Sequence, residues 1–214
     1  MKKIMFNDKY GLTQAVLEGR KTQTRRVLST TMFFQRLKTC EGWSNEDIRA
    51  WKRSCNRQLY ETQGYMLQQM LDYALSSSRY KLGETIAIAQ RYEDMAKDDD
   101  FFRLCSNILG RILFEKGCHN KMFVRADLMP HHIRITNIRV ERLQDISEDD
   151  CLKEGVWRGD NVGLEGTTYW YHGLVNSSFR TAKEAYASLI DRISGKGTWE
   201  SNPWVFVYDF ELVK

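Results

Sequence analysis

Residues 17–26 read LEGRKTQTRR and contain the one concentrated cluster of positive charge in the chain. Four cations fall within seven residues: Arg20, Lys21, Arg25 and Arg26. Gly19 stands where a glycine ends a helix, and the partial negative charge of a helix C-terminus favours cations there whatever their role. Most short basic runs are solvated turns. The cluster is therefore a candidate site that needs support from the rest of the chain.

Hydrophobic spacing predicts the elements around this cluster. Residues 3–6 indicate a short strand, and Leu12, Ala15 and Val16 recur at helical spacing. From residue 29 to residue 79 the pattern becomes helical, with a capping-box-like pair of Ser44 and Asp47. We interpret residues 29–79 as a helical insertion.

The second half of the chain alternates between strands and helices of unequal length. Residues 85–90 and 204–212 indicate strands, and residues 101–112 indicate a helix that follows three aspartates. A longer strand is expected over residues 132–143, where the apolar positions fall out of step at Asn137 and so predict a bulge. This order of elements favours an α+β domain, with a small mixed barrel as its architecture.

Glu154 occupies the last turn of a short helix that begins after Ser147 and stops at Gly155. A negative charge opposes the helix dipole there, although a solvated glutamate costs only about a few tenths of a kcal/mol. The placement hints at a function, but taken alone it is weaker than the ordinary explanation of a solvated side chain.

Composition limits the class of protein. The 214 residues are 42% hydrophobic and 28% charged, which is typical of a folded globular chain. With a formal net charge of +4, the chain lacks the strongly basic character of a dedicated nucleic-acid binder. It has no apolar stretch of about 18 residues and no secretory h-region, so we expect a cytoplasmic protein that does not bind a membrane.

The cysteines and the missing motifs exclude further classes. The five cysteines are scattered and odd in number, so we expect reduced thiols. Cys118 and His119 could join Cys105 in a zinc site, but no CxxC or HxxxH spacing supports one, and we expect neither a metal nor a cofactor. Walker, GxGxxG, GxSxG and HExxH motifs are also missing from the sequence.

The string at residues 19–24, Gly-Arg-Lys-Thr-x-Thr, resembles the signature of the ASCH domain, a branch of the PUA-like β-barrel superfamily. The resemblance continues in the family's order: residues 80–84 resemble its strand-entry segment, residues 140–155 its central block and residues 202–205 its closing strand. It covers a little over half of the chain. It implies a PUA-like mixed β-barrel with flanking helices, formed by residues 1–28 and 80–214, with residues 29–79 inserted within it.

The same resemblance implies a cleft that takes RNA or a modified nucleoside. In the bacterial N(4)-acetylcytidine amidohydrolases of this family, the catalytic set is a lysine, a threonine and a glutamate. Lys21 and Thr24 stand at the matching positions of the motif, and Glu154 stands in the block similar to the one that supplies the family's glutamate. The implied activity is hydrolysis of the amide of an N4-acylated cytidine.

The chemistry of these three residues is consistent with that activity. A threonine hydroxyl is a poor nucleophile until a base removes its proton, and a lysine that is desolvated among other cations can have a pKa low enough to be that base. A partly buried Glu154 would protonate the leaving amine. Residues 20–24 must then turn, because residues three apart point to opposite sides of a strand.

Two alternatives stay open beside amide hydrolysis. In a binding module without catalysis, the arginines Arg20, Arg25 and Arg26 hold RNA phosphates while Trp170, expected in a Gly-rich loop, stacks on a base. In a ribonuclease, the lysine and the activated hydroxyl cleave RNA instead.

The chain also departs from the family's pattern at several places. Glu84 replaces the usual aspartate, and residues 87–90 lack charged side chains. The insertion at residues 29–79 follows the motif directly, where it would cover the cleft, bind a protein partner or present a longer RNA. These departures bear on the substrate more than on the fold.

Overall fold

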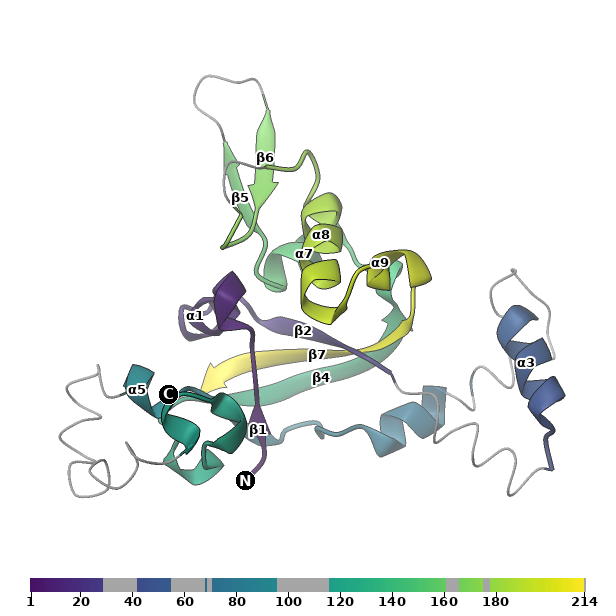
Figure 1. Ribbon diagram of the computed structural model, residues 1–214, viewed down its shortest axis with the longest axis horizontal. Helices are drawn as coiled ribbons and strands as arrows, with labels where there is room; N and C mark the ends of the chain where they lie inside the picture. Colours follow the sequence, from purple (N-terminus) through teal and green to yellow (C-terminus); the bar gives the residue numbers. More distant parts are fainter. Residues whose placement is uncertain are drawn as a thin grey trace.

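The computed structural model describes residues 1–28, 42–54, 68, 71–95, 116–160, 166–174 and 178–213. Figure 1 shows a sheet with helices gathered on one side and a separate two-stranded hairpin beyond those helices. The expected α+β class is therefore confirmed. The helix expected over residues 101–112 and much of the insertion lie outside the described residues.

Five strands form a mixed sheet in the order β1-β3-β4-β7-β2. Their bounds are β1 (Lys3–Ile4), β2 (Gln23–Val27), β3 (Thr85–Ile88), β4 (His132–Arg142) and β7 (Trp204–Val213). β1 and β3 are parallel, and every other neighbouring pair is antiparallel. Among the described strands the sheet is open, with β1 and β2 at its edges, so closure into the expected barrel is not seen.

The long pair of β4 and β7 contains the expected bulge. The pairing register shifts between Ile135 and Asn137. Ile138 consequently packs against the same hydrophobic cluster as Ile133 and Ile135, although it is an odd number of positions from both. Because side chains alternate along a strand, only an extra residue can bring Ile138 to that side.

Short helices cover one side of the sheet. They are α1 (Leu12–Leu17), α7 (Glu148–Lys153), α8 (Ala182–Ser194) and α9 (Thr198–Ser201), of which α7, α8 and α9 lie together in Figure 1. The capping box of Thr181 and Glu184 starts α8, and Ser147 caps α7. None of the described helices is long and apolar enough to cross a bilayer.

The remaining helical elements are short and lie outside this group. They are α3 (Asn45–Ser54), α5 (Tyr92–Met95), η1 (Asp8–Tyr10), η2 (Lys116–Cys118), η3 (Lys121–Phe123), η4 (Ala126–Leu128) and η5 (Leu143–Asp145). Ser44 and Asp47 exchange hydrogen bonds at the start of α3, as the capping-box pattern predicts. The helical character expected for the insertion is thus confirmed where the structure describes it.

The second sheet corrects one expectation. β5 (Trp157–Asp160) and β6 (Thr167–Trp170) form an antiparallel hairpin, so Trp170 lies in a strand and not in the Gly-rich loop that we expected. A Cβ atom on Gly159 would lie 2.3 Å from the Trp170 ring. A larger side chain at this position would displace the indole.

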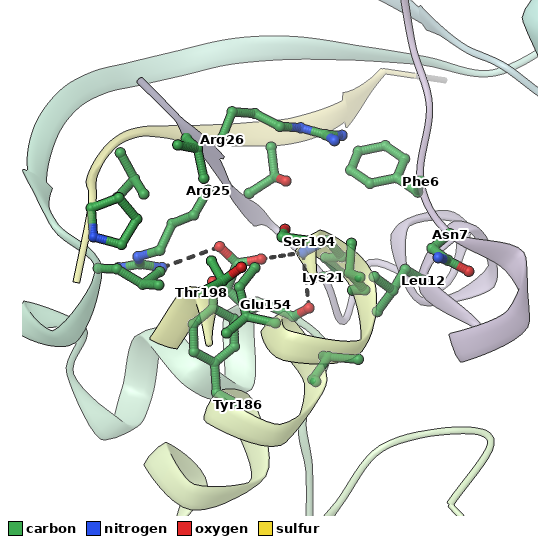
Figure 2. A pocket seen from close by; sticks show the side chains of 18 of the residues that line it. Phe6, Asn7, Leu12, Lys21, Arg25, Arg26, Glu154, Tyr186, Ser194 and Thr198 are labelled. Atoms are coloured by element: carbon green, nitrogen blue, oxygen red, sulfur yellow. Dashed lines mark hydrogen bonds and ion pairs between the residues drawn. The ribbon is translucent and has the colours of Figure 1, made fainter. Parts of the chain in front are cut away.

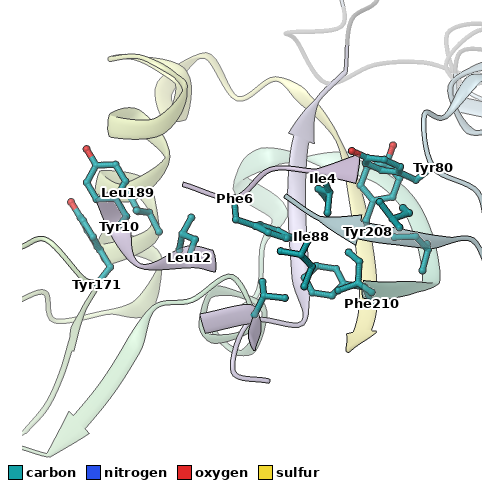
Figure 3. Packing of buried hydrophobic residues seen from close by; sticks show 14 residues of the cluster. Ile4, Phe6, Tyr10, Leu12, Tyr80, Ile88, Tyr171, Leu189, Tyr208 and Phe210 are labelled. Carbon is teal, nitrogen blue, oxygen red and sulfur yellow. The ribbon is translucent and has the colours of Figure 1, made fainter. Parts of the chain in front are cut away.

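Two hydrophobic clusters meet at β7, whose buried side chains are divided between them. One, seen in Figure 3, includes Tyr208 and Phe210 of β7, and the other includes Val205 and Val207 together with residues of α7 and α8. β2 runs beside β7, with Thr24 opposite Tyr208 and Arg25 opposite Val207. The first three residues of β2, Gln23, Thr24 and Arg25, are buried, whereas Arg26 and Val27 are exposed.

The described thiols are buried and free. These are Cys118 and Cys151, and the other three cysteines lie outside the described residues. Burial raises the pKa of Cys151 to about 12. This thiol therefore stays protonated near neutral pH, as expected for a structural cysteine.

Candidate active site

The turn after α1 carries Lys21 into a buried position. Gly19 follows the helix with a φ of 73°, the left-handed conformation that commonly ends helices. The backbone N–H groups of Arg20 and Lys21 both donate to the Ala15 carbonyl, at 2.9 Å each. The chain thus turns before β2, but Thr24 already lies within that strand, so the turn expected over residues 20–24 is found only in its first half.

Glu154 reaches the same place from the other end of the chain. It is the C-terminal cap of α7, the position at which the helix dipole disfavours an acid. Its side chain is only 5% exposed. A buried carboxylate needs cations or hydrogen-bond donors to compensate for the lost water, and Glu154 has two such partners.

The first partner is Lys21, whose ammonium group is fully engaged. Its Nζ atom donates to Glu154 Oε2 at 2.5 Å, to the Glu154 backbone carbonyl at 2.8 Å and to the Gln23 carbonyl at 2.7 Å. Burial lowers the pKa of Lys21, and the neighbouring Glu154 charge opposes this shift without cancelling it. The lysine is thus held as a desolvated ammonium group in direct contact with a carboxylate, although the two residues are 133 positions apart.

The second partner is Arg25, whose side chain has no exposed surface. Its guanidinium donates to Glu154 at 3.2 Å, to Glu141 at 2.7 Å and to Asp150 at 3.1 Å. A further bond from Nη1 reaches the Gln23 side chain, and one from Nε reaches Glu141 again. All five N–H groups of Arg25 are therefore used inside the protein, and none remains for the RNA phosphate that we expected it to hold.

The Asp150 carboxylate beside Arg25 is stabilised in its charged form. Burial alone would raise the pKa of Asp150, but hydrogen bonds from Lys153 and Arg25 outweigh it and hold this pKa below its ordinary value. Although burial would lower the pKa of Arg25, the nearby Glu154 and Glu141 charges raise it overall. This cluster of ion pairs fixes the position of Glu154 from the side opposite Lys21.

Thr24, Lys21 and Glu154 all line one cavity of about 690 Å³, shown in Figure 2. The wall is otherwise largely apolar, with Leu12 and Leu189 among its side chains. Thr24 is buried, and its hydroxyl makes no side-chain hydrogen bond with a described residue. The three residues implied by the resemblance thus share a cavity, but in this structure Lys21 is bonded to Glu154 and not to Thr24.

Arg26 lines the same cavity from its outer side. Unlike Arg25, it is exposed, and its Nη2 atom donates to the Met5 carbonyl at 2.7 Å. Among the arginines of the basic cluster, Arg26 alone lies at this cavity and on the surface. It is the member of the cluster that can meet an incoming ligand.

The other two predicted binding residues lie away from this cavity. Arg20 pairs with Glu18 at 2.6 Å and stacks on Trp157, with its guanidinium carbon 3.7 Å from the ring centroid. It lines a second hollow of about 470 Å³ that does not share a lining residue with the first. Trp170 packs over Gly159 and lines neither hollow.

One group of side chains in the described part of the chain has the composition of a metal site. Glu93, Cys118 and His119 place one ligand atom each within 4.8 Å of one another. Glu93 is already engaged by His119 at 2.7 Å and by Arg91 at 2.8 Å. A metal would have to displace both contacts, so this group is a weaker candidate than the cavity beside Lys21.

Several residues around the cavity were not found from the sequence. Glu141 and Asp150 hold Arg25, and Tyr186 of α8 lines the cavity. Asp150 reads as an ordinary first-turn acid of α7, and Tyr186 as one of the apolar positions of α8. Because the helix alone explains an acid at Asp150 and an aromatic residue at Tyr186, no local feature of the sequence indicates that either residue has a role at the site.

Comparisons with protein-family models, curated proteins and solved structures found no match for the chain.

Proposed function

We propose that this protein is an ASCH-type amidohydrolase that removes the acyl group from an N4-acylated cytidine, with the described sheet forming part of a PUA-like barrel. The observation that carries the proposal is the buried contact of Lys21 Nζ with Glu154 Oε2, at 2.5 Å, in a cavity that Thr24 also lines. Perturbed, paired ionisable groups in a cavity are typical of active sites.

The first step begins with the buried pair. Transfer of a proton from Lys21 to Glu154 leaves a neutral amine and a neutral acid, and burial of Lys21 lowers its pKa and so favours the amine. Lys21 already donates to the carbonyl of Gln23, the residue directly before Thr24. Exchange of that one contact for the Thr24 hydroxyl would make the lysine the base for the nucleophile.

The second step forms and breaks the acyl bonds. The Thr24 oxygen attacks the acyl carbon as its proton passes to Lys21, and collapse of the tetrahedral intermediate breaks the C–N bond. Glu154 gives its proton to the departing amino group of cytidine, which restores the charged pair. Attack of water on the acyl-threonine by the same proton transfers then releases the carboxylic acid and regenerates the hydroxyl.

The cavity suits a nucleoside of this kind. Ligand sites commonly have volumes of about 300–1,000 Å³ and mostly apolar walls with a few polar groups, and this cavity of about 690 Å³ falls within that range. Arg26 at its outer side would face the ribose or a phosphate of a longer RNA. A nucleoside base would then enter the apolar part beside Lys21 and Glu154.

The purified protein is expected to convert N4-acetylcytidine into cytidine and acetate, measured by liquid chromatography. Lys21→Met and Glu154→Gln should each reduce kcat by about 100-fold or more, because each removes one proton-transfer group. Lys9→Met, at an exposed lysine that does not line the cavity, is the matched control and should leave kcat unchanged. Absence of product from the folded wild-type protein, or full activity of folded Lys21→Met, would refute the proposal.

A second candidate, RNA binding without catalysis, is favoured by the exposed Trp157 ring beside Arg20. Trp157 is 37% exposed and lines the second hollow, where a base could stack on its ring. If Arg26 and one more cation contact phosphates, affinity for single-stranded RNA should fall about sevenfold between about 50 and about 200 mM salt. Fluorescence anisotropy with labelled RNA measures this affinity. An affinity that does not change with salt would exclude RNA binding of this kind. Shortening of the RNA during the measurement would indicate a ribonuclease.

A further inference from the structure

Tyr186 has a buried hydroxyl that no described residue satisfies. The residue lies in α8 and is 2% exposed. Among the described residues, its oxygen is the one buried side-chain nitrogen or oxygen atom without a hydrogen-bond partner. Most such groups are paired in folded proteins, because an unpaired polar atom loses its water without compensation. An exception of this kind calls for a reason.

The hydroxyl lies at the candidate active site. Tyr186 lines the cavity together with Lys21, Thr24 and Glu154. Figure 2 shows its ring directed from α8 toward the Glu154 carboxylate. Burial, and then the Glu154 charge, hold the pKa of Tyr186 well above its ordinary value, so the hydroxyl keeps its proton and can act as a donor.

The charged groups around the hydroxyl have little capacity left for a ligand. The two carboxylate oxygens of Glu154 already accept from Lys21 and Arg25. All three protons of Lys21 and all five N–H groups of Arg25 are also used. Among the buried polar side chains of described residues that line the cavity, the hydroxyls of Tyr186 and Thr24 are therefore the groups that remain available.

We infer that the Tyr186 hydroxyl donates a hydrogen bond to the carbonyl oxygen of the ligand that fills this cavity. This inference rests on the proposed function, and it assigns the acceptor as the acyl oxygen of the N4-acyl group. A neutral carbonyl suits the position better than an anion, because an anion would lie beside Glu154.

The same bond would assist the reaction. When the Thr24 oxygen attacks the acyl carbon, the carbonyl oxygen becomes negatively charged, while Glu154 holds the proton taken from Lys21 and carries no charge. A donor already directed at the carbonyl oxygen stabilises its charge most strongly in the transition state. An unpaired donor in the free protein needs no other contact to be broken before it acts. Tyr186 is thus a catalytic residue that stabilises the oxyanion, beside the base and the nucleophile.

The test is Tyr186→Phe, which removes only the hydroxyl. We expect kcat for N4-acetylcytidine to fall by about 100-fold, the usual effect of one lost oxyanion donor, with KM changed by less than about threefold. Tm should stay the same or rise, because the hydroxyl has no partner to lose.

Tyr171→Phe is the matched control. The Tyr171 hydroxyl shares a hydrogen bond of 2.9 Å with Ser188 of α8, the helix that also carries Tyr186. Tyr171 does not line the cavity. Tyr171→Phe should lower Tm by about 2–4 °C and leave kcat unchanged. The inference about Tyr186 is overturned if Tyr186→Phe has the wild-type kcat, whether or not its Tm falls as in Tyr171→Phe. The proposed function would survive that result. A wild-type protein inactive on N4-acetylcytidine overturns the proposed function, and this assignment with it.

Discussion

Replacement of Thr24 by valine is expected to reduce hydrolysis of N4-acetylcytidine by about 1,000-fold or more, because it removes the proposed nucleophile. Valine has nearly the shape of threonine, so contacts with the neighbouring strand are kept. The Thr24 hydroxyl makes no side-chain hydrogen bond with a described residue, and its loss should leave the free energy of unfolding nearly unchanged. Steady-state kinetics and urea unfolding measure the two effects separately.

Two further variants make this result specific. Thr22→Val changes a threonine two positions away that does not line the cavity, and it should leave kcat unchanged. Thr24→Ser keeps a hydroxyl and should retain measurable activity. If Thr24→Val hydrolyses the substrate at the wild-type rate, attack must come from water, and Thr24 merely forms part of the wall.

The elements of the fold were predictable where their causes are local. The caps of α7 and α8 depend on residues three positions apart, and they are found as expected. The bulge in β4 was predicted because Ile135 and Ile138 are out of step, and a strand can correct this only by an extra residue. Closure of the sheet depends on distant pairings, and no local pattern specifies it.

The contact of Lys21 with Glu154 was predictable only in part. The resemblance selected both residues, and the position of Glu154 at the end of α7 was a local irregularity that a buried partner explains. That partner comes from a turn 133 residues away. Local electrostatics could therefore indicate that Glu154 is unusual, but not which cation compensates it.

The positive charge of residues 20–26 led to a wrong prediction of the surroundings of Arg25. Its place in a basic cluster indicated a surface that binds phosphate, whereas three acids from β4 and α7 enclose it. The unpaired hydroxyl of Tyr186 likewise arises only when α8 packs over the cavity. In both cases the chemistry of a side chain is decided by residues that the local sequence does not contain.

Arg25→Met is expected to destabilise the protein by about 3–5 kcal/mol near neutral pH, because it leaves buried carboxylates without their shared cation. The side chain of Arg25 is fully buried against Glu154, Glu141 and Asp150. Arg26→Met changes the next residue of β2, whose side chain is exposed, and should alter the free energy of unfolding by no more than about 0.5 kcal/mol. Urea unfolding at constant salt measures both.

The pH dependence of the free energy of unfolding shows whether Arg25→Met destabilises the protein by leaving carboxylates without a cation or by removing packing contacts. In the wild-type protein the pKa of Asp150 is lowered, so its contribution to stability is present above its unfolded pKa of about 3.9 and is lost as the pH falls through the folded value. Without Arg25 the carboxylates should have raised pKa values, and acid then favours the folded variant. The difference between the two proteins should therefore shrink from pH 8 to about pH 4. A difference that stays constant over this range would mean that Arg25 stabilises the fold by packing, with the carboxylates compensated by other groups.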